Sequence, residues 1–409
     1  MSGLSSNVCG QTVDLKKNAI AAFKNGNYPE AIDLMDKAKS INPGDPEVYY
    51  YLGMFLHYRA YDSRPLMGYD VSYTSKIFYN LRKAIELKPD YGDAYYFLGA
   101  QHGAIASDAL EKGDTSEYKK CFNDAFKEKC FPAWLIEYDL NILKSCDKDA
   151  VLIVGGDAEY DPIQYLQQIE NYRKDVTVVP YAFLERPWFV KIIRDGIPNV
   201  IAKAPISLSE DQIMDLHPFK WDTLNIKVPI PGFVKNEYKL PPDTFFEWKL
   251  EPDLTSQRGN YLSVARAVIA NMIETNQWKR PLYFSLGCSP TFFGGLDEYF
   301  QLCGLVNKVL PFKTANTKFN IDHERVTEVL LDKDNVKNFN DVTLHDMPRV
   351  SRILGNYYGA LYRLAESFKK NNQQEKIPSI INFVKQNLPN KSLPYSDAMV
   401  KELEELLKN

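Results

Sequence analysis

The sequence predicts an α/β plus α protein, with helical repeats, a mostly parallel βα sheet domain and a C-terminal helical hairpin. Three observations lead there: a recurring pattern of small residues and prolines near the N-terminus, short apolar runs alternating with amphipathic stretches, and two amphipathic helices near the C-terminus. We expect a disordered or linker segment at residues 1–11, repeats at 12–132, the α/β domain at 133–347 and the helical hairpin at 348–409.

The composition excludes several classes of partner. The 409 residues carry 49 basic and 53 acidic side chains, a net charge of −4, and nucleic-acid binding needs clustered Lys and Arg. No apolar run is long enough for a membrane-spanning helix, so we expect no direct membrane span. The six cysteines are scattered and form no CxxC pair, and the first residues lack the regions of a secretory signal peptide. We therefore expect no nucleic acid and no disulfide scaffold.

Residues 12–130 repeat a two-helix pattern. The first unit has small or apolar residues and a closing proline at the spacing of a repeat of about 34 residues, namely Ala19, Ala31, Met35, Ala38 and Pro43. A second unit runs from Pro46 to Pro89 and a third begins at Gly92, both with extra residues between their helices. The pattern resembles tetratricopeptide repeats, in which stacked helix pairs share one core.

The first helix of each such unit lines a concave surface. The spacing places Tyr50, Met54 and His57 of the second unit and Tyr96 of the third on this surface. An aromatic, uncharged groove suits an extended peptide or a partner helix, so we predict another protein or a peptide as the partner. The alternative is that the protein's own next domain fills the groove. We expect the insert at residues 58–73 to cover the groove or to carry a contact.

From residue 133 the pattern becomes strand–helix–strand. Helices are expected at 133–144, 162–173, 187–194 and 261–275, and strands at 150–154, 176–180, 223–228, 245–249, 281–286 and 304–311. This order implies a right-handed βαβ crossover and helices on both faces of the sheet. The proline-rich stretch at 230–243 is expected to be an inserted loop.

The turn GGDAEYDP follows the first strand, at the edge where open α/β sheets bind ligands. As a dinucleotide loop it lacks GxGxxG, and as a calcium loop it has Pro162 where glycine is needed. It is either a structural turn whose Asp caps the next helix or part of a cleft for a polar ligand. The cleft candidates are Asp157, Glu159, Tyr160, Asp161 and Trp188. We expect no metal and no cofactor.

No catalytic constellation is present in the sequence. None of the five histidines falls in HExxH or a Ser/Cys–His motif, and GxSxG is absent. Cys288 follows a strand end, but a buried cysteine acting as a small hydrophobe accounts for it more simply. We name no catalytic residue, and the balance is towards a protein that is not an enzyme.

Four collinear blocks carry a second resemblance. They begin with VLIVGGDAEYDPIQYL and continue with APISLSEDQI, ANMIETNQWKRPLYFSLG and GLDEYFQLCGLVNKVLPFK. The region 148–312 resembles the soluble C-terminal part of a bacterial family of polytopic membrane proteins, frequent in Bacteroidetes, whose membrane half is related to eukaryotic protein O-mannosyltransferases. The final helical hairpin also matches. The resemblance implies an extracytoplasmic location, in the periplasm or cell envelope.

Two hypotheses follow from the departures from that family. The membrane half that would carry sugar transfer is replaced by repeats, and the family's Asn-Gly-Asp-Asn-Asp-Thr turn reads Gly155-Gly156-Asp157-Ala158-Glu159-Tyr160. The first hypothesis is a non-catalytic interaction or scaffold protein of the cell envelope that presents its groove to an envelope protein. The alternative is a degenerate carbohydrate- or glycoconjugate-binding or -processing module. A carboxylate pair at the mouth of an apolar pocket would favour the alternative.

Overall fold

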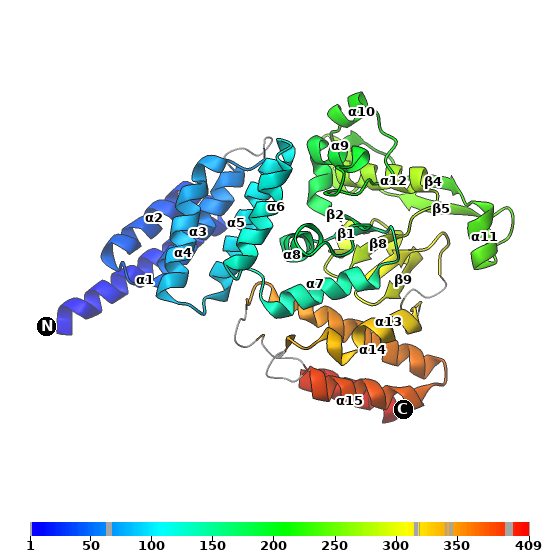
Figure 1. Ribbon diagram of the computed structural model, residues 1–409. Helices are drawn as coiled ribbons and strands as arrows, with labels where there is room; N and C mark the ends of the chain where they lie inside the picture. The colour runs from blue at the N-terminus through cyan, green and yellow to red at the C-terminus, as the bar shows by residue number, and fades with distance from the viewer. Residues whose placement is uncertain are drawn as a thin grey trace. The chain divides into compact units, whose positions relative to one another are not determined.

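The computed structural model describes residues 2–62, 68–314, 318, 320–339, 342, 347–388 and 396–408 (Figure 1). The chain divides into two compact units. We call Met1–Pro132 with Val342–Arg352 the helical unit, and Ala133–Asp341 with Ile353–Asn409 the α/β unit. Among the described residues, no helix combines the length and the apolar character that crossing a membrane requires.

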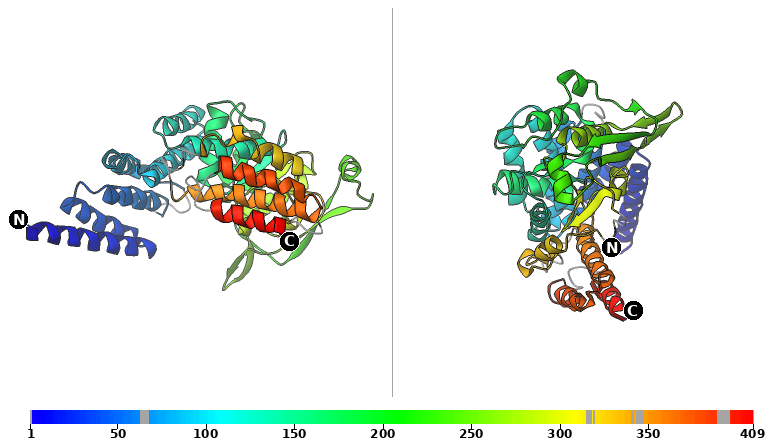
Figure 2. Two further views of the ribbon diagram at one scale, coloured as in Figure 1. Left: turned by 90° about the horizontal axis from the view of Figure 1, so that it is seen from below. Right: turned by 90° about the vertical axis from the view of Figure 1, so that its right-hand side faces the viewer.

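The helical unit is a succession of helices in which each packs on the next (Figure 2, blue to cyan). They are α1 (Ser2–Lys24), α2 (Tyr28–Ile41), α3 (Pro46–Asp62), the short η1 (Val71–Tyr73), α4 (Thr74–Leu87), α5 (Gly92–Glu111) and α6 (Thr115–Lys127). Small residues permit the close contacts: Ala31 and Ala84 are fully buried, and a Cβ at Gly53 would lie 2.6 Å from Leu81 Cγ. Asn27 and Asp114 cap the second helices of two pairs.

Helix α1 corrects one expectation. It begins at Ser2, so residues 2–11, which we expected to be disordered or a linker, are helical. The segment contains no proline, and its glycines, Gly3 and Gly10, each weaken a helix by only about 1 kcal/mol. Continuity with the strongly helical residues that follow is enough to extend the helix.

The core of the α/β unit is a five-stranded sheet among the described residues, in the order β2-β1-β8-β10-β9. The strands are β1 (Val151–Val154), β2 (Thr177–Pro180), β8 (Leu282–Ser285), β9 (Phe300–Cys303) and β10 (Val306–Val309). Strand β1 pairs in parallel with β2 and β8, and all three are buried throughout, as expected of strands covered on both faces.

The other side of the sheet is antiparallel. The sheet as a whole is therefore mixed, and not mostly parallel as expected. Strand β10 runs antiparallel to both β8 and β9. The single strand expected at 304–311 is the second arm of a hairpin, and its first arm was missed. Gly304, with φ of +70°, makes the tight turn between the arms, where a Cβ would lie 2.2 Å from the Ser145 hydroxyl.

Helices pack around this sheet. They are α7 (Ala133–Ser145), α8 (Asp157–Gln168), η2 (Tyr181–Glu185), α9 (Pro187–Asp195), α10 (Glu210–Met214), α12 (Val264–Asn276) and α13 (His323–Leu330). Short 3₁₀ turns are η3 (Pro290–Phe292), η4 (Leu296–Tyr299), η6 (Lys333–Asn335), η8 (Ser351–Leu354) and η9 (Gln374–Lys376). Near the C-terminus, α14 (Gly355–Lys370), α15 (Ile377–Asn387) and α16 (Ser396–Lys408) pack on one another, and α14 also contacts α13 (Figure 2, orange to red).

Two smaller sheets complete the α/β unit. One pairs β4 (Leu224–Pro229) with β5 (Phe245–Leu250), and α11 (Gly232–Tyr238) lies between them in sequence (Figure 1). The other joins β3 (Phe219–Lys220), β6 (Leu254–Ser256) and β7 (Gly259–Leu262). Strand β5 alternates exposed and buried residues, so Phe246, Trp248 and Leu250 point inward.

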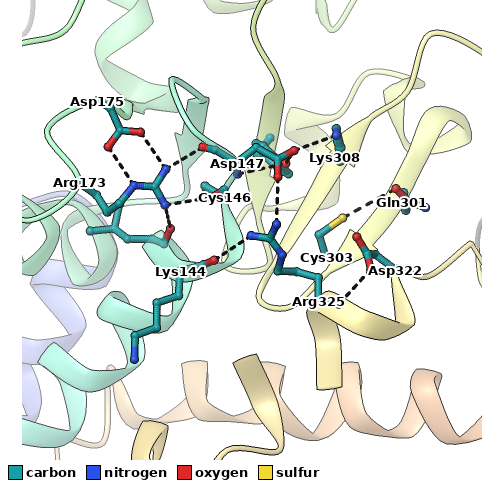
Figure 3. Close-up of polar contacts among 12 residues, drawn as sticks. Lys144, Cys146, Asp147, Arg173, Asp175, Gln301, Cys303, Lys308, Asp322 and Arg325 are labelled. Carbon is teal, nitrogen blue, oxygen red and sulfur yellow. Dashed lines mark hydrogen bonds and ion pairs between the residues drawn. The ribbon is translucent and has the colours of Figure 1, made fainter. Parts of the chain in front are cut away.

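A charged cluster holds the beginning of β1 in place (Figure 3). The Asp147 carboxylate accepts from the Tyr283 hydroxyl at 2.7 Å and pairs with Lys308 at 2.9 Å and Arg325 at 3.1 Å. Burial opposes ionisation of Asp147, but these hydrogen bonds and charges lower its pKa below the ordinary value. The Arg173 guanidinium donates to the carbonyl oxygen of Leu143 in the last turn of α7 and to those of Cys146 and Asp147 just after the helix. Cations at a helix C-terminus are stabilising, which makes this cluster structural.

Candidate functional site

A cavity of about 740 Å³ opens beside the carboxyl ends of β2 and β8. Its walls come from the turn after β2 (Tyr181 and Glu185), from residues 248–254, from the start of α12 (Ser263 and Arg266) and from residues 290–298. Ligand pockets in proteins have volumes of roughly 300–1,000 Å³, and open α/β sheets bind ligands at this edge. Its size and place make it the candidate site.

A buried arginine lies at the base of the cavity. Arg266 is 4% exposed, and its Nη2 donates to the Thr291 carbonyl oxygen at 2.8 Å and lies 3.6 Å from Asp253 Oδ2. Its Nε has no hydrogen-bond partner among the described residues. A buried donor without a partner is unfavourable, so the Arg266 Nε is an unsatisfied donor in the wall of the cavity.

Two carboxylates bind the N-terminus of α12. Asp253 accepts from the Ser263 backbone N–H at 2.7 Å and from its hydroxyl at 2.6 Å, while Ser263 caps the helix through the Arg266 N–H. Glu185 Oε1 accepts from the Ala265 N–H at 3.0 Å. Acidic groups are favoured at this end of a helix. Burial raises the pKa of Glu185 and the neighbouring charge of Asp253 adds to this, although the helix amides oppose it.

One wall of the cavity is aromatic. The rings of Tyr181 and Phe292 stack with their centroids 3.9 Å apart and their planes 4° apart, and both side chains are half-buried. Trp248, 1% exposed, donates from Nε1 to the Gly294 carbonyl oxygen at 2.8 Å. The stacked pair therefore presents a flat apolar surface beside the charged base.

Two glycines allow the wall to approach the base. At Gly294, whose φ is +59°, a Cβ would lie 1.8 Å from Arg266 Nη1, so no other residue fits without moving the guanidinium. Gly295, with φ of +86°, continues the same turn. The FFGG sequence is thus required by the cavity's shape.

The rim carries exposed charges that are paired. Lys249 contacts Glu251, and Lys313 contacts Glu298. Exposed pairs of this kind contribute little to stability, typically about 0–1 kcal/mol, so they leave the rim polar and adaptable. The cavity combines an apolar face with hydrogen-bond donors and acceptors and with side chains of both charges.

The region that contains the cavity also matches a known protein family.

Residues 136–217 and 246–329 match the family model described as TMEM260-associated domain 2.

The TMEM260-associated match is consistent with the O-mannosyltransferase-related family that the sequence blocks resemble. Every residue that lines the cavity falls within the two matched segments. The stretch between them, residues 218–245, holds the strands β3 and β4 of the smaller sheets and the helix α11. No curated protein matches the chain. The cavity is therefore lined by the matched segments and not by the unmatched stretch between them.

None of the five predicted cleft residues lines this cavity. Glu159, 2% exposed, uses its carboxylate internally: Oε2 accepts from the Gly155 N–H at 2.9 Å and from the Ser285 hydroxyl at 2.6 Å. A Cβ at Gly155 would lie 2.4 Å from the Gly287 carbonyl oxygen. Glu159 thus joins the turn after β1 to the end of β8, a contact that neither interpretation of this segment predicted. The expected helix cap by an Asp side chain is not formed, because Gly156 occupies the N-cap position of α8.

Of the other four residues, Asp157, Tyr160 and Asp161 lie in the first turns of α8, and Trp188 lies in α9. Helix α8 begins at Asp157, which is exposed, and not at Pro162 as expected. Tyr160 and Trp188 each contact the Phe183 ring, with centroids 5.7 and 6.1 Å apart. Asp161 is buried, and burial together with the charge of Asp157 raises its pKa well above the ordinary value. These contacts make the aromatic residues part of the packing between α8 and η2.

The predicted groove residues lie in the helical unit. Tyr50, Met54 and His57 are each at most 6% exposed, and Tyr96 is half-buried with its ring against Phe97. Residues 63–67 of the insert expected to cover the groove lie outside the described residues. Tyr69, on its C-terminal side, donates to Gln101 Oε1 at 2.5 Å.

Cys121, Cys130, Cys146, Cys288 and Cys303 are buried. The Cys288 thiol contacts the Ile153 carbonyl oxygen at 3.4 Å, and burial raises its pKa, which makes the thiolate scarce. No group of three or more His, Cys, Asp or Glu in the described part of the chain is placed to hold a metal ion.

Proposed function

We propose that the α/β unit binds a carbohydrate or glycoconjugate in the cavity beside Tyr181, Phe292 and Arg266, and does so without catalysing a reaction. Of the two hypotheses from the sequence, this is the alternative one. It places the ligand in the cavity and not at the turn after β1, where the sequence predicted it. The observation that carries the proposal is that a stacked aromatic pair lines the same cavity as an arginine and two carboxylates.

The chemistry of the walls suits a polyhydroxylated ligand. A sugar ring has an apolar face that packs on an aromatic surface, and hydroxyl groups that both donate and accept hydrogen bonds. The Tyr181–Phe292 pair supplies the surface, Asp253 and Glu185 supply acceptors, and the Arg266 Nε supplies a donor. A purely anionic or purely apolar ligand would leave one of these groups without a partner.

The carboxylates support binding more than catalysis. Asp253 and Glu185 already accept hydrogen bonds from Ser263 and from the Ala265 amide at the start of α12. A general acid or nucleophile has to gain or lose a proton or form a bond during the reaction, and these hydrogen bonds hold both groups in a structural role. They remain able to accept from ligand hydroxyls through their other lone pairs.

We assign the helical unit to the tetratricopeptide type and propose that it serves as a scaffold for a protein partner. Support comes from the packing of successive helices and from the close approach at Gly53 and Ala31. The resemblance to the O-mannosyltransferase-related family further supports placing the chain outside the cytoplasm, with an envelope protein as partner and an origin in Bacteroidetes.

The proposal can be tested by measuring binding of the full chain to mannose-containing and other oligosaccharides, using a glycan array followed by calorimetry. Phe292→Ala removes half of the aromatic pair while leaving the buried base intact. We expect it to weaken binding at least about tenfold, since burial of such a ring is worth roughly 1.5–3 kcal/mol.

Trp188→Ala is the matched control, because it truncates a half-buried aromatic residue of the same unit outside the cavity. It should leave the affinity unchanged. The proposal fails if no oligosaccharide binds the wild-type chain, or if Phe292→Ala and Trp188→Ala have the same effect on binding.

A further inference from the structure

Residues 347–352 belong to the helical unit although they lie far along the chain from its helices. From this segment, Arg349 reaches α3 and α5. Its Nε donates to the Tyr50 hydroxyl at 3.0 Å, its Nη2 lies 3.4 Å from Met54 Sδ, and its backbone N–H donates to Asp93 Oδ1 at 3.2 Å. Two of the residues expected to bind a partner therefore contact a side chain of the protein itself.

The groups around Arg349 are of the kinds that bind an arginine side chain. Asp93 supplies a carboxylate, with Oδ2 3.8 Å from the Arg349 Nε. The guanidinium carbon lies 5.4 Å from the centroid of the Phe97 ring, within the range of a cation–π interaction. Burial raises the pKa of Tyr50 and the Arg349 charge partly offsets this, so the phenol stays protonated. A planar cation with several donors fits this combination better than an ammonium group does.

The segment itself is a compact turn. Val350 and Ser351 both donate backbone hydrogen bonds to the Met347 carbonyl oxygen, at 2.7 and 2.8 Å. Met347 and Val350 are each 2% exposed, whereas the Arg349 side chain is 43% exposed. Two apolar residues thus anchor the turn, and the arginine between them remains accessible to solvent, where ion pairs are weak.

We propose that the surface formed by Tyr50, Met54, Asp93 and Phe97 is a binding site for an arginine-bearing turn of a partner protein. Residues 347–352 are then its internal occupant, and the partner binds only when this segment leaves. The exposed guanidinium supports exchange, because its solvent-accessible ion pair with Asp93 is weak and a partner that adds further contacts can replace it together with the two apolar anchors. This proposal is independent of the cavity in the α/β unit, and either can fail without the other.

The test uses the full-length chain and a fluorescent peptide with the sequence of residues 347–352, MPRVSR. In a released variant, Met347→Ser, Arg349→Ala and Val350→Ser remove the anchors and the internal arginine. We expect this variant to bind the peptide at least tenfold more tightly than the wild-type chain, as measured by fluorescence anisotropy. A peptide with citrulline in place of its first arginine has nearly the same shape without the charge, and should bind at least tenfold more weakly.

Adding Asp93→Asn to the released variant should also reduce peptide binding at least tenfold. If the released variant keeps wild-type helicity and binds the peptide no better than wild type, the proposal is wrong. It is equally wrong if the citrulline peptide binds as well as the arginine peptide. Should the released variant fail to fold, the single variant Arg349→Ala is tested with Nα-acetyl-arginine amide. A rise in its Tm that neither the wild type nor acetyl-citrulline amide shows supports the proposal, and the absence of that difference overturns it.

Discussion

The helical unit and the α/β unit differ in which acidic and basic side chains they bury. Among the described residues of the helical unit these are histidines: His57, 6% exposed, lies 3.4 Å from Gln101 Oε1, which also accepts from Tyr69, and His102 is also 6% exposed. In the described part of the α/β unit they are mostly acids, among them Asp139 at 0% and Glu159 at 2% exposure, and Arg266 at 4% is the exception. Burial disfavours the charged form, so the pKa of His57 falls and those of Asp139 and Glu159 rise.

The two units also bring their elements together differently. At Gly53 the neighbour is the end of the Leu81 side chain, which can adopt another rotamer. At Gly155 the neighbour is the Gly287 backbone, whose flanking residues Leu286 and Cys288 donate backbone hydrogen bonds to Leu305 and Ser285. The close approach at Gly53 therefore tolerates small adjustments, whereas the one at Gly155 is held by rigid backbone and does not.

The largest expected effect tests that rigidity. Gly155→Ala places a methyl group 2.4 Å from the Gly287 carbonyl oxygen, so the backbone has to shift, and we expect a loss of about 3 kcal/mol in the free energy of unfolding. Urea denaturation followed by circular dichroism measures it.

Gly156→Ala is the neighbouring control. No atom lies within 4 Å of its Cβ position, and φ of 173° is extended backbone that alanine adopts. Its effect should stay within about 1 kcal/mol. Equal effects at the two positions would show that the close backbone approach at Gly155 has no energetic consequence.

The second prediction concerns the acid response of the helical unit. Burial lowers the pKa of His57 to about 4, below the ordinary value of 6.5, so the unfolded chain binds a proton more readily than the folded one. Stability from this group is fully present above pH 6.5 and is lost as the pH falls towards 4. The loss over that window is about 3 kcal/mol, since one pKa unit corresponds to about 1.4 kcal/mol.

Urea denaturation of the wild type and of His57→Gln at pH 7 and pH 4 measures this loss. The variant should lack the part of the acid sensitivity that His57 provides. His217→Gln is the control, because the His217 side chain is 59% exposed. Its pH profile should match that of the wild type. A wild type and a His57→Gln variant with the same pH dependence would show that His57 is not the acid-sensitive group.

Much of this architecture could be predicted because it depends on local patterns. The apolar runs at β1, β2 and β8 mark buried strands, and the spacing of small residues such as Ala31 marks the helix pairs. The predicted start of α8 at Pro162 was wrong, since the favoured first position of proline was given more weight than the turn before it. Gly156 ends the extended segment, and Asp157 and Glu159 then lie in the first helical turn, where acidic residues are favoured.

The cavity could not be predicted in the same way. Its walls come from four segments that lie far apart in the sequence, and each resembles an ordinary loop or helix start when considered alone. One signal was present: Arg266 interrupts an apolar helix, and a charged residue in such a position is buried only with partners. The contact of Arg349 with Tyr50 is likewise a product of the tertiary fold, which no local pattern contains.

The smallest expected effect concerns Asp139, whose contribution to stability changes with pH in the direction opposite to that of His57. Neither carboxylate oxygen of Asp139 has a hydrogen-bond partner among the described residues. Burial and then the charges of Glu159 and Asp161 raise its pKa well above the ordinary value. The folded state therefore binds the proton more readily than the unfolded one, and stability falls as the pH rises from about 4 through the folded-state pKa.

Asp139→Asn keeps the shape and removes the ionisation, so it should raise the free energy of unfolding by about 1 kcal/mol at pH 8 and change it little at pH 4. Asp147→Asn is the matched control in the same unit. Its carboxylate has three partners and a lowered pKa, so the substitution should destabilise the protein at pH 8. A loss of stability in Asp139→Asn at pH 8 would mean that the buried carboxylate is ionised and stabilised there. The contrast between a helical unit that buries a neutral His57 and an α/β unit that buries a protonated Asp139 would then not hold.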